Sequence, residues 1–334
     1  MTHVNKRRRA ILIQGAAALA ALPFAGSAFA ATPDAAAYPR KPIKIVVPFA
    51  PGGPTDLMAR AISRPMSESL GQTVVVINKP GGTGVIALSE VHNAPADGYT
   101  LAFPSIQAVT TPALRSDFPF DMTKDFTGVS VVGYISHLLV VNEKLPANNL
   151  KEFIELVKAN PSKYFYGSSG NGSSGHLAME MFKDRAGITL EHTPYKGAAP
   201  AIQDLLSGRI HAIFLDTTVA LPLVKDKKIK VLAVPTAERS KLLPEVPTIA
   251  EQGFPGFAIH PWYGLLARAG TDPAIIQKLN EHVKKALADP QVAETFSSLG
   301  IEPGGNSPEA FNQLISEDLK TWDNIAKKLN LKIQ

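Results

Sequence analysis

The chain has 334 residues, 45% of them hydrophobic and 19% charged, which fits a globular protein with room for two domains. It contains no cysteine, which excludes disulfides, thiolate metal sites and redox CxxC chemistry. The net charge of +5 comes from 34 basic and 29 acidic residues, and four of the basic residues lie at Lys6–Arg9. The rest of the chain has 30 basic and 29 acidic residues and is nearly neutral, which argues against a nucleic-acid binder.

Residues 1–30 are predicted to be an export signal. The basic start leads into an apolar stretch that ends in Ala28-Phe29-Ala30, a small-x-small cleavage pattern. A transmembrane anchor is the alternative, but the stretch is rich in Ala and Gly and is interrupted by Pro23. The Arg8-Arg9 pair matches a twin-arginine signal only in part, so Sec and twin-arginine export both stay open. We expect a cleaved protein that begins at Ala31 and resides in the periplasm.

Strands and helices then alternate along the first part of the chain. Each predicted strand is followed by a predicted helix or a short turn, and strands separated by helices of this length predict a parallel sheet in an α/β domain. The strands are expected at 43–49, 73–79 and 98–104, and the helices at 55–71 and 83–94.

A second alternating set begins near residue 149. Its helices are expected at 149–161, 176–187 and 199–210, and its strands at 163–168, 188–195, 211–216 and 229–235. The chain then passes through 262–267 into helices at 273–288, 290–298 and 308–329. The last helix starts at Ser307-Pro308, an N-cap followed by proline. Its apolar face is expected to be core and carries Phe311, Leu314, Ile315, Leu319, Trp322 and Ile325.

The C-terminal helices have no sheet of their own, so we expect them to pack on the first set. Domain 1 would then be discontinuous and comprise 38–138 and 258–334, while domain 2 comprises 139–257. The predicted fold class is α/β, with two doubly wound domains joined by two hinge strands near 131–142 and 256–266. A cleft between two such domains is a natural site for a small ligand.

Three glycine-rich loops each lie between a strand and a helix. They are Pro51-Gly52-Gly53-Pro54, "KPGGTG" at 79–84 and "GSSGNGSSGH" at 167–176. Such loops sit at the carboxyl ends of strands and can expose backbone N–H groups to an anion. One loop alone is more simply a tight turn, but three with serine and threonine hydroxyls favour binding. None contains arginine, so neutral N–H and O–H donors would hold the anion.

The third loop also contains a G-x-G-x-x-G pattern at Gly170, Gly172 and Gly175. Glu191, near the end of the next predicted strand, stands where a ribose-binding acid would. An exported nicotinamide-dependent oxidoreductase is therefore the main alternative function. It is disfavoured because an exported protein has little access to nicotinamide, and Glu191 is also explained as the solvent-side neighbour of Leu190.

Other catalytic and metal sites are not indicated. The sequence has no G-x-S-x-G elbow, and its histidines show no HExxH or HxH spacing. We therefore predict no enzyme activity, no metal and no cofactor. Two residues stay open between roles: His176 either donates to a ligand or holds the helix start, and Asp56 either contacts the ligand or stabilises the first turn of its helix.

Five segments in order carry a specific resemblance. The chain resembles receptors of the tripartite tricarboxylate transporter family, the Bug-type extracytoplasmic solute-binding proteins, from about Tyr38 to the C-terminal helices. The segments are "YPRKPIKIVVPFAPGGPTDLMAR", "NKPGG", "ADGYTLAF", "YKGAAPAIQDLLSGRIHAIFLD" and "EVPTIAEQGFPGF".

The resemblance implies a two-lobed periplasmic binding protein fold, similar to type II, that closes on a small organic carboxylate. It also implies delivery of that ligand to the membrane permease subunits of a tripartite tricarboxylate transporter, by a monomer that binds no nucleic acid. A sensor that reports the ligand to a membrane kinase would share this fold and site, so it remains an alternative.

The resemblance also implies a set of ligand-binding residues in the cleft. The second loop departs from the proline-glycine-alanine-glycine-glycine-asparagine usual in the family at Gly82, Thr83 and Val85. Thr83 adds a hydroxyl and Val85 removes an amide, so dicarboxylate, tricarboxylate and aromatic acid all stay open as ligands. The expected site residues are Phe49, Pro51, Gly52, Gly53, Thr55, Asp56, Thr83, Gly84 and Ser105 in the first lobe, and Ser168, Ser169, Gly172, Ser173, His176, Lys196 and Asp216 in the second.

Overall fold

The computed structural model describes residues 37–332. The predicted signal peptide at 1–30 and its expected cleavage point before Ala31 lie outside the described residues. Within the described range, no helix combines the length and the apolar character needed to cross a membrane.

The first lobe is built on a six-stranded sheet in the order β11-β4-β10-β3-β1-β2. The predicted parallel strands are β1 (Ile43–Val47), β2 (Val74–Asn78) and β3 (Thr100–Ala102), and they pair in parallel. The sheet as a whole is mixed rather than parallel, because antiparallel strands complete it. These are β4 (Phe126–Ile135), β10 (Trp262–Arg268), which pairs antiparallel with β3 and β4, and β11 (Ile301–Pro303), which pairs antiparallel with β4.

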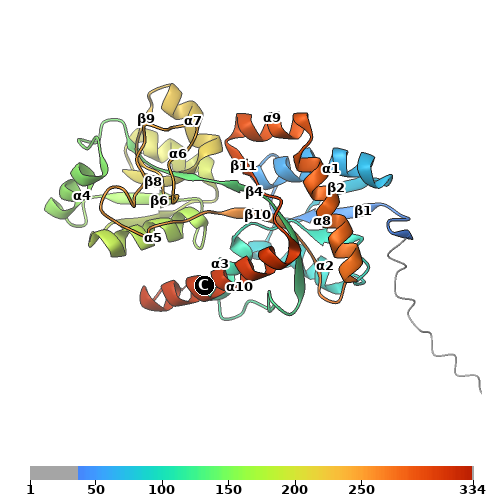
Figure 1. The fold of residues 1–334 in the computed structure, drawn as a ribbon. Helices are drawn as coiled ribbons and strands as arrows, with labels where there is room; N and C mark the ends of the chain where they lie inside the picture. The colour runs from blue at the N-terminus through green and yellow to red at the C-terminus, as the bar shows by residue number, and fades with distance from the viewer. Residues whose placement is uncertain (1–36, 333–334) are drawn as a thin grey trace, which may run out of the picture. The chain divides into compact units, whose positions relative to one another are not determined.

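Helices cover both faces of this sheet (Figure 1). α1 (Pro54–Leu70), α8 (Pro273–Leu287) and α9 (Pro290–Leu299) share one core with the sheet, and α2 (Val85–Asn93), α3 (Gln107–Leu114) and α10 (Pro308–Lys328) share the other. The C-terminal helices therefore pack on the first sheet, as expected. The apolar face of α10 is core, because Phe311, Ile315 and Trp322 are buried. Ser307 caps this helix by accepting from the Ala310 N–H.

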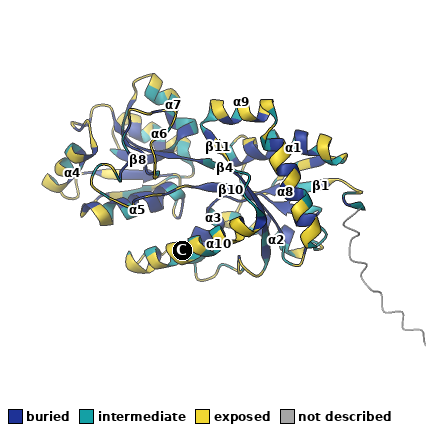
Figure 2. Cartoon of the chain, in the orientation of Figure 1, coloured by how far each residue is buried: buried dark blue, intermediate teal, exposed yellow. Residues whose placement is uncertain are grey.

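The second lobe is built on a five-stranded sheet in the order β7-β6-β8-β5-β9. β6 (Phe165–Ser168), β7 (Glu191–Pro194) and β8 (Ala212–Asp216) are parallel, whereas β5 (His137–Asn142) runs antiparallel to β8 and β9 (Ile229–Ala233). The strands of both sheets form the buried centre, and exposed residues lie on the outer sides of the helices (Figure 2). The helices are α4 (Leu150–Ala159), α5 (Ser174–Ala186), α6 (Ala198–Ser207) and α7 (Thr217–Lys225).

The chain crosses between the sheets twice. β4 ends at Ile135 in the first sheet and β5 begins at His137 in the second, with only Ser136 between them. The chain returns after β9 through residues 255–261 into β10. The Ile135 N–H donates to the Pro261 carbonyl over 3.1 Å, so the two crossings touch each other. The two-lobed α/β fold is confirmed.

Candidate functional site

The first glycine-rich loop is held in place by Asp56, which is only 2% exposed. Its carboxylate accepts hydrogen bonds from the Gly52 N–H at 2.9 Å, from Asn78 Nδ2 at 2.9 Å and from Arg60 Nε at 3.0 Å. Burial opposes ionisation, but the hydrogen bonds from Arg60, Gly52 and Asn78 outweigh it and lower the pKa of Asp56. Both carboxylate oxygens are therefore occupied, and the structure assigns Asp56 to anchoring the loop.

The same loop leaves the start of α1 open. The N-cap is Gly53, no side chain caps the helix, and Pro54 at the first position has no N–H of its own. The N–H groups of Thr55 and Asp56 in the first turn thus lack a side-chain partner, at the positive end of the helix dipole. Gly52 has φ +86°, a conformation that favours glycine, whereas Gly53 has an ordinary φ of −81°.

The second loop runs in a left-handed conformation for four residues, from Gly81 to Gly84, and includes the short helical turn η2 (Gly82–Gly84). Thr83 shares this conformation with φ +53°, which is strained for a β-branched residue. Its hydroxyl donates to the Gly82 carbonyl at 2.6 Å and accepts from Arg115 Nη1 at 3.1 Å. Although no arginine belongs to the loops, Arg115 therefore reaches this one from the end of α3.

One small cavity is lined by the two residues that follow β1, by the second loop and by the residues at the end of β3, whereas Pro51–Pro54 of the first loop do not line it. Asn78 Nδ2 donates to the Phe49 carbonyl at 3.1 Å, and a Cβ on Gly84 would lie 3.7 Å from Pro48. The volume of this cavity is about 10 Å³, which is enough for a single water molecule. Four predicted site residues line it, namely Phe49, Thr83, Gly84 and Ser105, together with Pro48, Leu88, Pro104, Gln107 and Ala108.

The polar groups of the third loop are largely used within the loop. Ser168 Oγ lies 2.7 Å from His192 Nε2 and accepts from the Gly170 N–H. Ser173 caps α5 by accepting from the His176 N–H at 3.3 Å, and His176 Nδ1 accepts from the Gly172 N–H at 3.1 Å. His176 therefore holds the helix start, which was one of its two expected roles.

The imidazole of His176 also belongs to an aromatic stack. Its ring centroid lies 4.2 Å from that of His192, which in turn lies 4.6 Å from Tyr166. Burial lowers the pKa of both histidines, that of His192 to about 3. Both rings are therefore neutral at physiological pH and bring no positive charge to the cleft.

The third loop meets the first lobe at α3. Thr110 Oγ1 donates to the Gly172 carbonyl at 3.4 Å. The remaining expected site residues do not line the small cavity in this structure: Ser169 and Lys196 are exposed, and the Ser169 carbonyl accepts from the Gly197 N–H at 3.1 Å.

Asp216 belongs to a separate cluster at the crossing between the sheets. His137 Nε2 lies 3.0 Å from Ser174 Oγ and 3.6 Å from Asp216 Oδ1. Burial raises the pKa of Asp216 and lowers that of His137. A catalytic triad needs the acid and the nucleophile on different ring nitrogens. Here both lie at Nε2, and Nδ1 has no partner among the described residues, so the cluster does not activate Ser174.

The topology contradicts the dinucleotide interpretation of the third loop. The expected ribose-binding acid, Glu191, is the first residue of β7 and pairs with Phe165 at the start of β6. The loop follows Ser168 at the other end of β6, so Glu191 lies at the wrong edge of the sheet. The prediction placed Glu191 near the end of its strand because the strand was expected to begin at 188. Among the described residues, no group of three or more His, Asp or Glu side chains could hold a metal ion.

Comparison with known proteins gives consistent matches over nearly the whole chain. The family described as the tripartite tricarboxylate transporter family receptor matches residues 58–331. Protein BugT of Bordetella pertussis is 36% identical over 312 residues, which cover 93% of this chain and 96% of BugT.

Solved structures agree with these sequence matches. R. palustris Rpa4515 with adipate superimposes with a TM-score of 0.80 at 36% identity, covering 88% of this chain and 99% of that one. MatC from Rhodopseudomonas palustris with bound malate gives a TM-score of 0.76 at 30% identity, covering 86% and 99%.

Proposed function

This chain belongs to the tripartite tricarboxylate transporter family of receptors, and we propose that it captures a small dicarboxylate in the cleft between its lobes. The family includes periplasmic binding proteins. We place this protein in the periplasm after cleavage of residues 1–30, where a monomer delivers the ligand to the permease subunits without catalysis.

One observation carries the choice of an anionic ligand. α1 and α2 both begin without a side-chain cap, and the segments that lead into them contribute Phe49 and Gly84 to the same cavity, although the Val85 N–H of α2 already donates to the Gly82 carbonyl. Uncapped N–H groups and the positive ends of two helix dipoles favour a carboxylate. Ser105 adds a hydroxyl that accepts from the Gln107 N–H and has no acceptor for its own proton among the described residues.

A dicarboxylate matches this arrangement better than a single acid group. The first carboxylate is proposed to bind Ser105, Thr83, Gly84 and the open start of α1, and the second to face the third loop, which reaches α3 at Gly172. Adipate and malate, bound in the two related structures, are both dicarboxylates. Asp56, Ser168, Ser173 and His176 are then proposed to shape the loops, and Pro51, Gly52, Ser169, Lys196 and Asp216 to border the cleft.

The size of the cavity implies movement. A space for one water molecule cannot hold a dicarboxylate, and all residues that line it belong to the first lobe. We therefore propose that the ligand binds against this cavity from the side that faces the second lobe, and that the lobes separate before it enters. The expected boundary at 138 lies two residues too late, because β5 begins at His137 in the second sheet. We propose that residues 38–135 with 262–332 and residues 137–254 move as two bodies about the crossings at Ser136 and 255–261.

A ligand panel tests this function. Malate, succinate, adipate, citrate, benzoate and NAD are added separately, and thermal unfolding is followed. A ligand at a hundredfold excess over Kd stabilises the native state by about 2.7 kcal/mol, or roughly 5–10 °C for a protein of this size. At least one dicarboxylate should give such a shift, and its dimethyl ester should give none because the helix starts lose their anion. A shift with NAD and none with any acid would contradict the receptor function.

A further inference from the structure

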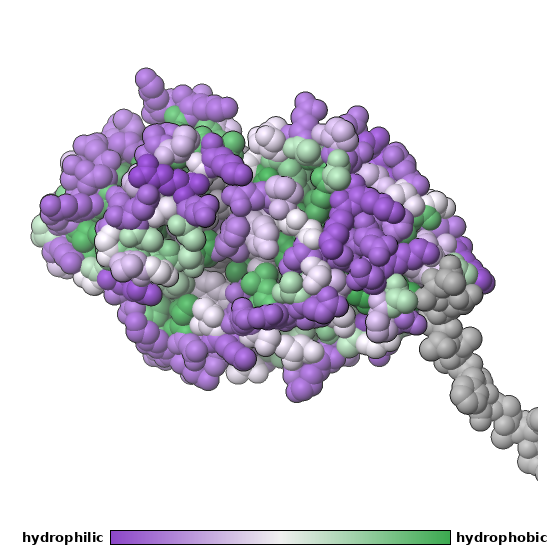
Figure 3. Space-filling view, in the orientation of Figure 1, coloured by the Kyte–Doolittle hydropathy of each residue, from purple (hydrophilic) through white to green (hydrophobic). Residues whose placement is uncertain are grey.

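A second cavity lies between the lobes, at the β11 edge of the first sheet. Its volume is about 250 Å³, and it shares no lining residue with the cavity at the glycine-rich loops. Figure 3 shows the surface hollowed between the parts that carry α7 and α9. We call it the rear pocket; it is lined by Ser136, Thr217, Ser240, Lys241, Leu242, Leu287, Ala293, Phe296, Ser297, Gly300, Ile301, Glu302 and Pro303.

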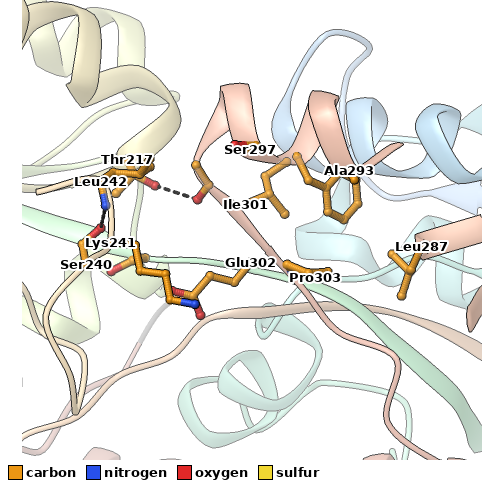
Figure 4. A pocket seen from close by; sticks show the side chains of 13 residues that line it. Thr217, Ser240, Lys241, Leu242, Leu287, Ala293, Ser297, Ile301, Glu302 and Pro303 are labelled. Carbon is orange, nitrogen blue, oxygen red and sulfur yellow. Dashed lines mark hydrogen bonds between the residues drawn. The ribbon is translucent and has the colours of Figure 1, made fainter. Parts of the chain in front are cut away.

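Both lobes contribute walls to the rear pocket. In Figure 4, Thr217 and Lys241 approach from the second lobe, and Ala293 and Ile301 from the first. Thr217 Oγ1 donates to the Gly300 carbonyl at 3.4 Å, and a dashed line marks this contact beside Thr217 in that view. Ser136, the single residue between the two sheets at the first crossing, also lines the pocket. Any rotation of the lobes about this crossing must therefore reshape the pocket.

The lining combines an apolar interior with a free positive charge. Leu287, Phe296 and Ile301 supply apolar surface from the first lobe, and Leu242 supplies it from the second, although its side chain is 43% exposed. Lys241 at the rim makes no ion pair with any residue that the structure describes.

The acidic residue of the pocket faces a histidine. Glu302 Oε2 lies 3.3 Å from His260 Nε2, outside the pocket lining, but burial lowers the pKa of His260, so this ring is neutral and Glu302 keeps its charge. Lys241 at the rim has no ion-pair partner among the described residues, and its ammonium group matches an anionic head group. Exposed apolar surface beside it matches an apolar body.

We propose that the rear pocket binds a small monocarboxylate with an apolar body, and that its occupancy is linked to closure of the ligand cleft. The apolar body packs between Leu242, Phe296 and Ile301, and the carboxylate meets Lys241. Because the walls belong to both lobes, the pocket differs between open and closed states. A ligand that prefers one of these states shifts their populations.

Hexanoate is the probe, and methyl NMR of the full mature protein is the measurement. Saturable shifts are expected at the methyl groups of Leu242 and Ile301, while Leu88, which lines the small cavity at the glycine-rich loops, stays unchanged. Lys241→Met should weaken hexanoate by about fivefold, the upper range for an exposed ion pair, and hexan-1-ol should bind the native protein more weakly by a similar factor. Lys158→Met, which removes an exposed lysine of α4, is the matched control and should leave binding unchanged. Ala293→Trp fills the pocket from exposed α9 and should abolish the shifts.

Several outcomes would overturn the proposal. Absence of shifts at Leu242 and Ile301, or shifts that survive Ala293→Trp, would show that the pocket is not the binding site. Equal binding of hexanoate and hexan-1-ol would remove the role of Lys241. None of these results depends on a dicarboxylate, so they stand apart from the test of the cleft.

The link to the cleft is measured separately, with the best dicarboxylate of the panel. Its affinity with saturating hexanoate should differ from its affinity alone by at least about twofold, and hexanoate should change by the same factor in return. Equal affinities under both conditions would overturn the link.

Discussion

A valine at Gly53 should abolish ligand binding and leave folding almost intact. Gly53 has φ −81° and ψ 169°, which any residue adopts, and an added Cβ would meet only the Ala50 carbonyl at 3.9 Å. The substitution should therefore cost at most about 1 kcal/mol, or 2–4 °C in Tm. In the complex, the new side chain stands over the start of α1, where a carboxylate would accept from Thr55 and Asp56. Hydrogen bonds to a charged group contribute about 1.5–3 kcal/mol each, so losing two corresponds to at least about a hundredfold in Kd.

Gly52→Val is the matched comparison, one position earlier. Gly52 has φ +86° and open space around it, so a valine there would cause no steric clash. Its backbone strain should lower the free energy of unfolding by about 1–3 kcal/mol. It should lower Tm more than Gly53→Val does. Calorimetric titration with the best dicarboxylate, together with thermal unfolding of both variants, makes the test. Affinity within threefold of the native value in Gly53→Val would refute the proposed cradle and leave the loop as a simple turn.

Three further predictions concern side chains around the loops and the core. Asp56→Ala should lower the free energy of unfolding by about 2–4 kcal/mol in urea titrations at pH 7, because three donors lose their acceptor. Folding lowers the pKa of Asp56, so the stabilisation by this carboxylate should fade as the pH falls below the pKa of 3.8 that it has in the unfolded chain. Arg115→Met should weaken dicarboxylate binding by about tenfold through loss of the hydrogen bond to Thr83, with little change in Tm, and an unchanged Kd would contradict this. Burial raises the pKa of Asp318 to about 6 despite a hydrogen bond from Trp262, so its protonated form is stable in the fold and stability falls as pH rises from about 4 through 6. Asp318→Asn should therefore raise Tm at pH 8 and not at pH 4, and equal effects at both pH values would show that the carboxyl does not titrate in this range.

The elements predicted correctly from the sequence are those with local signals. α10 has an N-cap at Ser307, a proline at its first position and an apolar face of regular spacing, and its start and buried face are as expected. β1 is apolar except for Lys44, and its other four residues are buried, which is typical of a strand covered on both faces. The two lobes follow because helices and strands alternate in two separate sets.

The elements missed lack such signals. α3 contains Thr110, Thr111 and Pro112, and α7 contains two threonines and Pro222, so neither has strong helix propensity. Burial supports α3 instead, because Val109, Thr110 and Thr111 are all buried beneath α10 and the sheet. Tertiary packing of this kind cannot be seen in a short stretch of sequence.

Sequence order placed the glycine loops after strands, and the structure confirms that placement, with the second loop lining the small cavity. The use of the polar groups was not predictable. The sequence did not indicate that Asn78, the first residue of the "NKPGG" segment, bridges Asp56 and the Phe49 carbonyl. Nor could it place Arg115 beside Thr83, since 32 residues and a strand separate them. Such contacts depend on how the loops fold over each other.

The balance of donors in the cleft favours two carboxylates over three. A carboxylate that leaves water loses its hydrogen bonds to the solvent, and unless protein donors replace them the desolvation costs more free energy than binding provides. In the first lobe, these donors are the Ser105 hydroxyl and the starts of α1 and α2, which have no side-chain cap, although the Val85 N–H of α2 already donates to the Gly82 carbonyl. In the third loop, Ser173 and His176 already serve the loop itself, and the imidazole of His176 is neutral. Arg115 cannot make up the difference, because Asp117 accepts two of its N–H groups. Apart from Lys196, which we propose to border the cleft, a third carboxylate would meet no free positive charge and no third set of donors among the described loop residues. We therefore expect citrate to bind more weakly than a dicarboxylate, although the family takes its name from tricarboxylates.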